Sequence, residues 1–95
     1  MSEGVQLPVS MDWSTDEVID VVNFFEAVDS AYGKGVERDL LVTLYRHYKA
    51  VVPSKAEEKQ HFKDYESQTG QSPYHTVKKA RESETGTVIK MSKNR

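Results

Sequence analysis

The chain has 95 residues, enough for one small domain with a modest core, and 37% of its residues are hydrophobic. It contains no cysteine, which excludes disulfides, thiolate metal sites and cysteine nucleophiles. No run approaches the roughly 18 apolar residues of a membrane span, and residues 1–12 lack the basic start and apolar stretch of a signal peptide. We therefore expect a cytoplasmic protein that binds no membrane.

The net charge of −2 is unevenly distributed along the chain. Residues 1–53 hold nine acids and four bases, a net charge of −5, whereas residues 54–95 hold six acids and nine bases, a net charge of +3. DNA-binding domains are usually much more basic than this second half. The charge pattern thus favours ordinary solvated helices over a dedicated nucleic-acid binder.

The first segment predicts an extended strap over residues 4–13. Its apolar residues alternate strictly, at Val5, Leu7, Val9, Met11 and Trp13. Pro8 points to the other side and rules out a central strand. We expect the apolar side to lie across the helices. A short pairing of this strap with residues 87–91 is an open alternative.

The first helix is predicted at about residues 15–33. Ser14 and Glu17 have the spacing of a capping box, and Trp13 is placed to pack on the helix start as a hydrophobic staple. One face of the helix is apolar, at Val18, Val21, Val22, Phe25, Val28 and Tyr32, and Phe24 and Ala31 widen it. Gly33 or Gly35 can end the helix in a left-handed conformation.

The second helix is predicted at about residues 37–52, because Pro53 forbids its continuation. Its apolar stripe comprises Leu40, Leu41, Leu44, Tyr45, Tyr48, Val51 and Val52. The short connection between the first two helices favours an antiparallel hairpin at the centre of the core.

Two further helices follow, at about residues 55–69 and 73–82. Ser54 and Glu57 form a second capping box pattern, and Gly70 suits the end of the third helix. The inward face of the third helix carries Phe62 and Tyr65, with Glu58 between them on the helical wheel. The fourth helix is signalled by the sequence Ser72-Pro73, a cap followed by a proline suited to the first helical position.

Residues 83–95 show no helical period and, apart from Val88, Ile89 and Met91, are expected to form a loose tail. Together these elements predict one all-α domain over residues 1–95. It is a compact array of four helices, two long and two short, with an extended N-terminal strap and a loose C-terminal tail.

The sequence offers little for catalysis. His47, His61 and His75 are evenly spaced, but Pro53 and Gly70 place them on three different helices, so we expect no metal site. There is no Gly-x-Ser-x-Gly elbow and no glycine-rich phosphate loop. We therefore expect no cofactor and no enzymatic activity.

Glu58 is the one carboxylate that the wheel places on an apolar face. A general acid or base would suit such a position. A structural role, bonded to backbone amides or to a base on a neighbouring helix, is the simpler interpretation.

Basic residues on the last two predicted helices form the candidate interaction surface: Lys55, Lys59, Lys63, Lys78, Lys79 and Arg81. This surface can be a solvated face, a docking face for an acidic protein, or the phosphate-contacting side of a helix-turn-helix. Pro73 and Tyr74 stand where a recognition helix would carry base-reading side chains.

Several motifs resemble an uncharacterised protein family, number 0223, of Gram-positive bacteria. They are Asp12-Trp13-Ser14-Thr15, Phe24-Phe25, VDSAYGKGV (28–36), VPSKAEEK (52–59) and SPYHTVKKA (72–80). The resemblance implies a small all-helical fold and supplies no activity, cofactor or catalytic residue.

We therefore expect an uncharacterised, non-enzymatic protein-interaction or accessory factor with an unidentified protein partner. The alternative is weak nucleic-acid binding through the basic faces of the last two helices. A homodimer is also compatible with the aromatic-rich helices.

Overall fold

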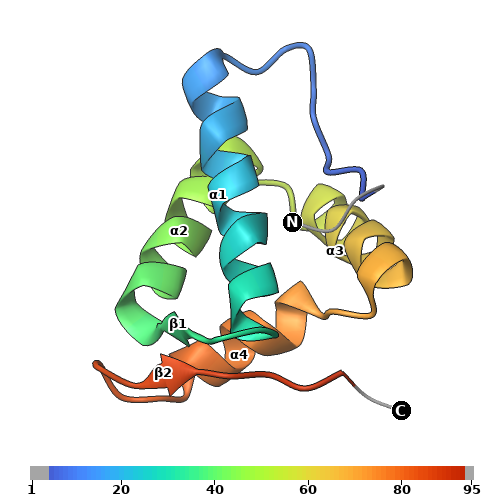
Figure 1. Cartoon of the computed structure of the whole chain (residues 1–95). Coiled ribbons are helices and arrows are strands. Elements are labelled where there is room, and N and C mark those ends of the chain that lie inside the picture. Colours follow the sequence, from blue (N-terminus) through green and yellow to red (C-terminus); the bar gives the residue numbers. More distant parts are fainter. Residues whose placement is uncertain (1–4, 94–95) are drawn as a thin grey trace.

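The computed structural model describes residues 5–93, which form four helices and one short pair of strands (Figure 1). The elements are α1 (Thr15–Ala31), β1 (Val36–Glu37), α2 (Arg38–Val51), α3 (Lys55–Thr69), α4 (Pro73–Arg81) and β2 (Val88–Ile89). The helices α1 and α2 make the most extensive contact, as an antiparallel hairpin. Helix α4 crosses beneath this hairpin, and α3 lies to one side of it.

Side-chain caps define where the helices begin. The hydroxyl of Ser14 accepts a hydrogen bond from the Glu17 amide, and the Ser14 amide donates to the Glu17 carboxylate at 2.8 Å, so the predicted capping box is complete. Ser54 and Ser72 cap α3 and α4 through their hydroxyls alone. The second predicted capping box is half formed, because the described residues show no bond from the Ser54 amide to the Glu57 carboxylate. Because these capping bonds join residues close in sequence, the observed helix ends lie within one or two residues of the predicted ones.

The prediction of an all-α fold with four helices is confirmed. The third helix has the predicted bounds, but with fifteen residues it is one residue longer than α2 and is not one of two short helices. Ser54 begins it and Gly70, in the left-handed conformation with φ 75°, ends it. Its two caps thus support a full-length helix despite its few apolar residues.

The C-terminal segment is ordered against the core, so the prediction of a loose tail is wrong for residues 87–91. β2 pairs antiparallel with β1, in the register Val36 with Ile89 and Glu37 with Val88, and the Ile89 side chain is fully buried. The Met91 amide also donates to the carbonyl of Ala31 at 2.7 Å. Residues 94 and 95 of the predicted tail lie outside the described residues.

The partner of the 87–91 segment is therefore β1, and the suggested pairing with the strap is wrong. The reason lies in the turn after α1. Gly35 has a φ of 104° and no side chain, which lets Val88 and Lys90 approach its backbone closely. Gly33, the other glycine of this turn, does not take a left-handed conformation.

The strap follows the prediction in part. Val5, Leu7 and Trp13 pack on the core, but Val9 and Met11 are exposed, at 61% and 101%. The alternation fails because the chain turns at Ser10, whose carbonyl accepts a hydrogen bond from the Trp13 amide at 3.1 Å. The predicted first residue of the strap, Gly4, lies outside the described residues.

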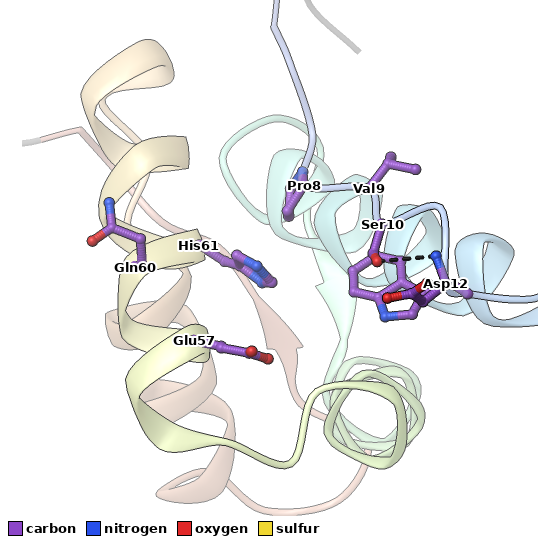
Figure 2. A pocket seen from close by; sticks show the side chains of 8 residues that line it. Pro8, Val9, Ser10, Asp12, Glu57, Gln60 and His61 are labelled. Carbon is purple, nitrogen blue, oxygen red and sulfur yellow. Dashed lines mark hydrogen bonds between the residues drawn. The ribbon is translucent and has the colours of Figure 1, made fainter.

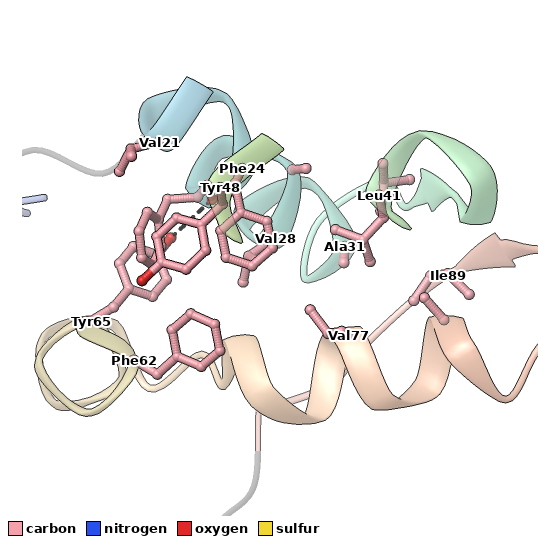
Figure 3. Packing of buried hydrophobic residues seen from close by; sticks show 14 of the residues in the cluster. Val21, Phe24, Val28, Ala31, Leu41, Tyr48, Phe62, Tyr65, Val77 and Ile89 are labelled. Carbon is pink, nitrogen blue, oxygen red and sulfur yellow. Dashed lines mark hydrogen bonds between the residues drawn. The ribbon is translucent and has the colours of Figure 1, made fainter. Parts of the chain in front are cut away.

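The core has an aromatic end and an aliphatic end (Figure 3). At the α3 end, the rings of Phe24, Tyr48 and Phe62 stack with centroids 5.0–5.8 Å apart, and Phe25 lies 4.9 Å from Tyr65. At the α4 and β2 end, the core consists of aliphatic side chains, among them Ala31, Leu41, Val77 and Ile89. The predicted inward residue Leu40 is instead 51% exposed, because α2 turns Leu41 toward the core.

We predict that Phe25→Ala lowers the free energy of unfolding by roughly 3–5 kcal/mol, because the ring is fully buried between α2 and α3. Urea denaturation measures the change. Ile19→Ala, on the exposed side of the same helix, is the control and is expected to shift stability by less than about 1 kcal/mol. An unchanged midpoint for Phe25→Ala would contradict this core assignment.

We also predict that Gly35→Ala destabilises the fold by about 1–3 kcal/mol. An added Cβ would lie 2.7 Å from a methyl carbon of Val88, on a backbone that disfavours side chains. Gly33→Ala, two residues earlier, is the matched control, since its Cβ would make only ordinary contacts. Equal midpoints for the two variants in thermal unfolding would show that β2 does not constrain this turn.

Candidate functional site

A cleft between α3 and α4 contains two of the predicted basic residues. Lys78 and Arg81 line this cleft, which has a volume of about 290 Å³, together with Glu58 and Phe62 from α3. On α3, at about 100° per residue, Lys55 and Lys59 lie within about 60° of Phe62 and Lys63 lies about 100° from it. All of these basic residues are exposed.

Lys79 does not belong to this group. Its ammonium donates to the carbonyl of Lys90 at 2.8 Å, on the side of α4 that carries β2. The predicted interaction surface is therefore divided by α4. Lys78 and Arg81 face the cleft, and Lys79 holds the C-terminal segment.

The α3–α4 cleft combines an apolar lining with two cations. Phe62 and Val77 are buried in its floor, while the Tyr74 ring is 58% exposed at its edge. The guanidinium of Arg81 lies 5.6 Å from the centre of the Tyr45 ring, within the range of a cation–π contact. This contact holds one cation over an aromatic wall.

Glu58 is engaged by α2 at both carboxylate oxygens. Lys49 donates to Oε1 at 2.6 Å and the Tyr45 hydroxyl donates to Oε2 at 2.7 Å, and only 13% of the Glu58 side chain is exposed. Burial, with this hydrogen bond, raises the pKa of Tyr45 to about 12. The prediction of a structural glutamate held by a base on a neighbouring helix is thus confirmed.

This pairing sets the charge of the cleft. The ammonium of Lys49 neutralises the charge of Glu58. The other charged lining residues are one carboxylate, Glu82, and two cations, Lys78 and Arg81. The cleft therefore presents a net positive charge over an apolar floor.

A second cleft, of about 510 Å³, lies between the strap and α3 (Figure 2). Its lining residues are Pro8, Val9, Ser10, Asp12, Trp13, Glu57, Gln60 and His61. Sequence reasoning missed this site. Glu57 and His61 are four residues apart and share one face of α3. The sequence pattern predicts a capping role for Glu57, and it gives the even spacing of His47, His61 and His75 no functional meaning, so the pair is not singled out.

His61 links this strap cleft to the core. Its Nδ1 lies 2.9 Å from the hydroxyl of the buried Tyr48, and its ring lies edge-on to Trp13 at 6.3 Å. Burial lowers the pKa of His61, although the carboxylates of Glu57, Asp64 and Glu58 oppose this shift. The neutral ring therefore dominates at pH 7, and its Nδ1 can accept a hydrogen bond from the Tyr48 hydroxyl.

The three histidines lie apart, on α2, α3 and α4, as predicted. His47 is 4.0 Å from Asp20, and His75 is 2.8 Å from the Ser72 hydroxyl. Within residues 5–93, no group of three or more histidine, aspartate or glutamate side chains is placed to hold a metal ion. Across the same residues, every helix is too short or too polar to cross a membrane.

We predict that His61 contributes to the pH dependence of stability. Its pKa in the folded protein is below the ordinary value of 6.5, so the unfolded chain binds more protons as the pH falls through that value. The free energy of unfolding should therefore drop between about pH 7.5 and 5, and drop less in His61→Asn, which retains a hydrogen-bonding side chain. Urea denaturation across this range measures both, and parallel curves would refute the contribution.

Comparison with known proteins places this architecture in a family. The model of an uncharacterised protein family, UPF0223, matches residues 4–89. A UPF0223 protein of Bacillus pumilus is 50% identical over 86 residues, which cover 90% of this chain and 97% of the relative. The protein YktA of Bacillus subtilis is 49% identical over 79 residues, covering 83% and 90%.

A UPF0223 protein of Staphylococcus saprophyticus is 51% identical over 73 residues, covering 77% of this chain and 79% of the relative. The names of these relatives state no activity, substrate or partner. All three come from Gram-positive bacteria, in agreement with the family expected from the sequence motifs. The chain therefore belongs to the uncharacterised protein family UPF0223.

Proposed function

We propose that the protein is a non-enzymatic, cytoplasmic interaction factor that binds an acidic segment of a partner protein in the α3–α4 cleft. The observation that carries this proposal is the pair of cations, Lys78 and Arg81, set beside an exposed aromatic ring over a buried apolar floor. A carboxylate of the partner would meet the two cations, and a neighbouring apolar side chain would cover Tyr74.

The size of the cleft supports a protein partner. At about 290 Å³ it is at the lower limit of cavities that enclose small molecules. It has room for one or two side chains of a peptide segment. The lysines of α3 that flank it would add long-range attraction for an acidic surface.

The arrangement of Glu58 supports a non-enzymatic role. A general base needs a carboxylate oxygen within reach of a substrate proton. Both oxygens of Glu58 are instead held by Lys49 and Tyr45. The carboxylate positions the cleft wall and gives charge balance to Lys49.

Weak nucleic-acid binding is the second candidate function, because Lys78 and Arg81 line this cleft and the three exposed lysines of α3 lie on the helix that forms its other wall. Glu66 and Glu82 interrupt those cations, and Pro73 and Tyr74 occupy the start of α4. Phosphate binding would show a steep loss of affinity with salt.

Photo-crosslinking in cells distinguishes these functions. We predict that p-benzoylphenylalanine at position 74, in the chain expressed in Bacillus subtilis, yields a discrete protein adduct whose crosslinked peptide is acidic. The same group at position 19, an exposed apolar residue of α1, is the positional control and should not give this adduct. Lys78→Glu with Arg81→Glu should abolish the adduct, since both cations of the cleft become anions.

Lys34→Glu with Lys90→Glu is the matched control, with the same change in net charge beside β1 and β2, and should leave the adduct intact. Three outcomes would overturn the proposal. They are an adduct that nuclease removes, an adduct that contains only a second copy of this chain, and one that survives reversal of Lys78 and Arg81.

A further inference from the structure

We infer that the strap cleft is a second binding site, which takes an arginine side chain from a basic, apolar-flanked protein segment. This inference concerns a different face of α3 and does not depend on the proposed function of the α3–α4 cleft. It rests on the charge, the aromatic wall and the fixed shape of the cavity beneath the strap.

The charge of the strap cleft is negative. Asp12 and Glu57 are among its eight lining residues, and neither lysine nor arginine is. Figure 2 shows Glu57 and His61 projecting from α3 toward Ser10 and Asp12 of the strap. Since the His61 ring is neutral at pH 7, it does not compensate these carboxylates. The cavity therefore attracts a cation.

The Glu57 carboxylate is available to a ligand. In α1, the corresponding Glu17 closes a capping box by accepting a hydrogen bond from Ser14. In α3, the Ser54 hydroxyl accepts from the Glu57 amide, and the reciprocal bond is not formed. Among residues 5–93, no side chain donates a hydrogen bond or forms an ion pair with the carboxylate of Glu57 or Asp12.

The aromatic wall favours arginine over lysine. Trp13 is half-buried at the edge of the cleft, and the Pro8 and Val9 side chains lie on the same wall. A planar guanidinium can stack on an indole and donate two parallel hydrogen bonds to a carboxylate, whereas an ammonium is a compact, strongly hydrated charge. The methylene stem of arginine would cover the apolar part of the wall.

The cleft is preformed, because the strap is fixed at both ends. The Gln6 amide donates to the Gln68 side chain at 2.9 Å, and that side chain donates back to the Gln6 carbonyl at 3.0 Å. At the other end, the capping box of Ser14 joins the strap to α1. Binding a side chain would therefore need little ordering of the protein.

The rim of the strap cleft indicates that the arginine belongs to a protein segment. Val9 lines the cavity with an exposed fraction of 61%, and Met11, which lies between the lining residues Ser10 and Asp12 in the chain, has an exposed fraction of 101%. Apolar residues next to the bound arginine would cover them, which a free amino acid or polyamine cannot do. The occupant is thus a basic residue flanked by apolar ones.

Trp13 is the only tryptophan of the chain and lines the strap cleft, so its fluorescence reports on binding directly. The probes are the blocked peptides acetyl-Gly-Leu-Arg-Leu-Gly-amide and its variants with glutamine or glutamate in place of arginine. We expect the arginine peptide to change Trp13 emission saturably with a Kd below about 1 mM. The glutamine peptide should bind about tenfold more weakly, and the glutamate peptide should produce no change.

Glu57→Gln and Asp12→Asn should each weaken binding of the arginine peptide by about three- to tenfold. Glu66→Gln is the matched control, because Glu66 is nine residues further along α3 and about 180° away around its axis. It should leave affinity unchanged, and the unfolding midpoints of all three variants confirm that they are folded.

Equal affinity for the arginine and glutamine peptides would overturn the inference, because it would show that the cleft binds the apolar residues of the peptide and does not recognise the charge. Equal effects of Glu57→Gln and Glu66→Gln would show only a general dependence on net charge. Unchanged Trp13 emission with the arginine peptide up to about 5 mM would also overturn it.

Discussion

The stack of aromatic rings from three helices is the contact on which the rest of the structure depends. Phe62 of α3 lies 5.8 Å from both Phe24 of α1 and Tyr48 of α2, and these rings are almost parallel. Helix α3 buries only Phe62 and Tyr65, so this stack supplies most of its apolar contact with the helical hairpin. The bonds of Glu58 to Lys49 and Tyr45, and of His61 to Tyr48, flank the stack. Both clefts use α3 as a wall, and their shapes are therefore set by these few rings.

The sequence predicted features that depend on neighbouring residues. Ser14 with Glu17, and Ser54 with Gly70, mark helix ends because capping involves atoms a few positions apart. The position of Glu58 on an apolar face followed from the helical period, but its partner Lys49 on α2 did not, because that contact depends on how α3 packs on α2. The family could also be recognised from the sequence, because each of its motifs is a short run of neighbouring residues.

Features that depend on distant parts of the chain could not be predicted. The pairing of β2 requires the unusual backbone of Gly35, and only the folded turn shows which glycine has it. The strap cleft depends on how Gln6 meets Gln68 and on the turn at Ser10, neither of which has a periodic signal. The result is a third helix with a cationic cleft on one side and an anionic cleft on the other.

The pairing of β1 with β2 has a consequence for synthesis of the protein. Val36 and Ile89 lie far apart along the chain, so their contact closes a loop that contains α2, α3 and α4. A nascent chain can form the α1–α2 hairpin from local contacts, and α4 can cover part of its aliphatic end, but the cover is complete only when Ile89 pairs with β1. A chain that stops before Ile89 would therefore have an incomplete core, with the aliphatic side chains around Ala31 and Leu41 partly exposed.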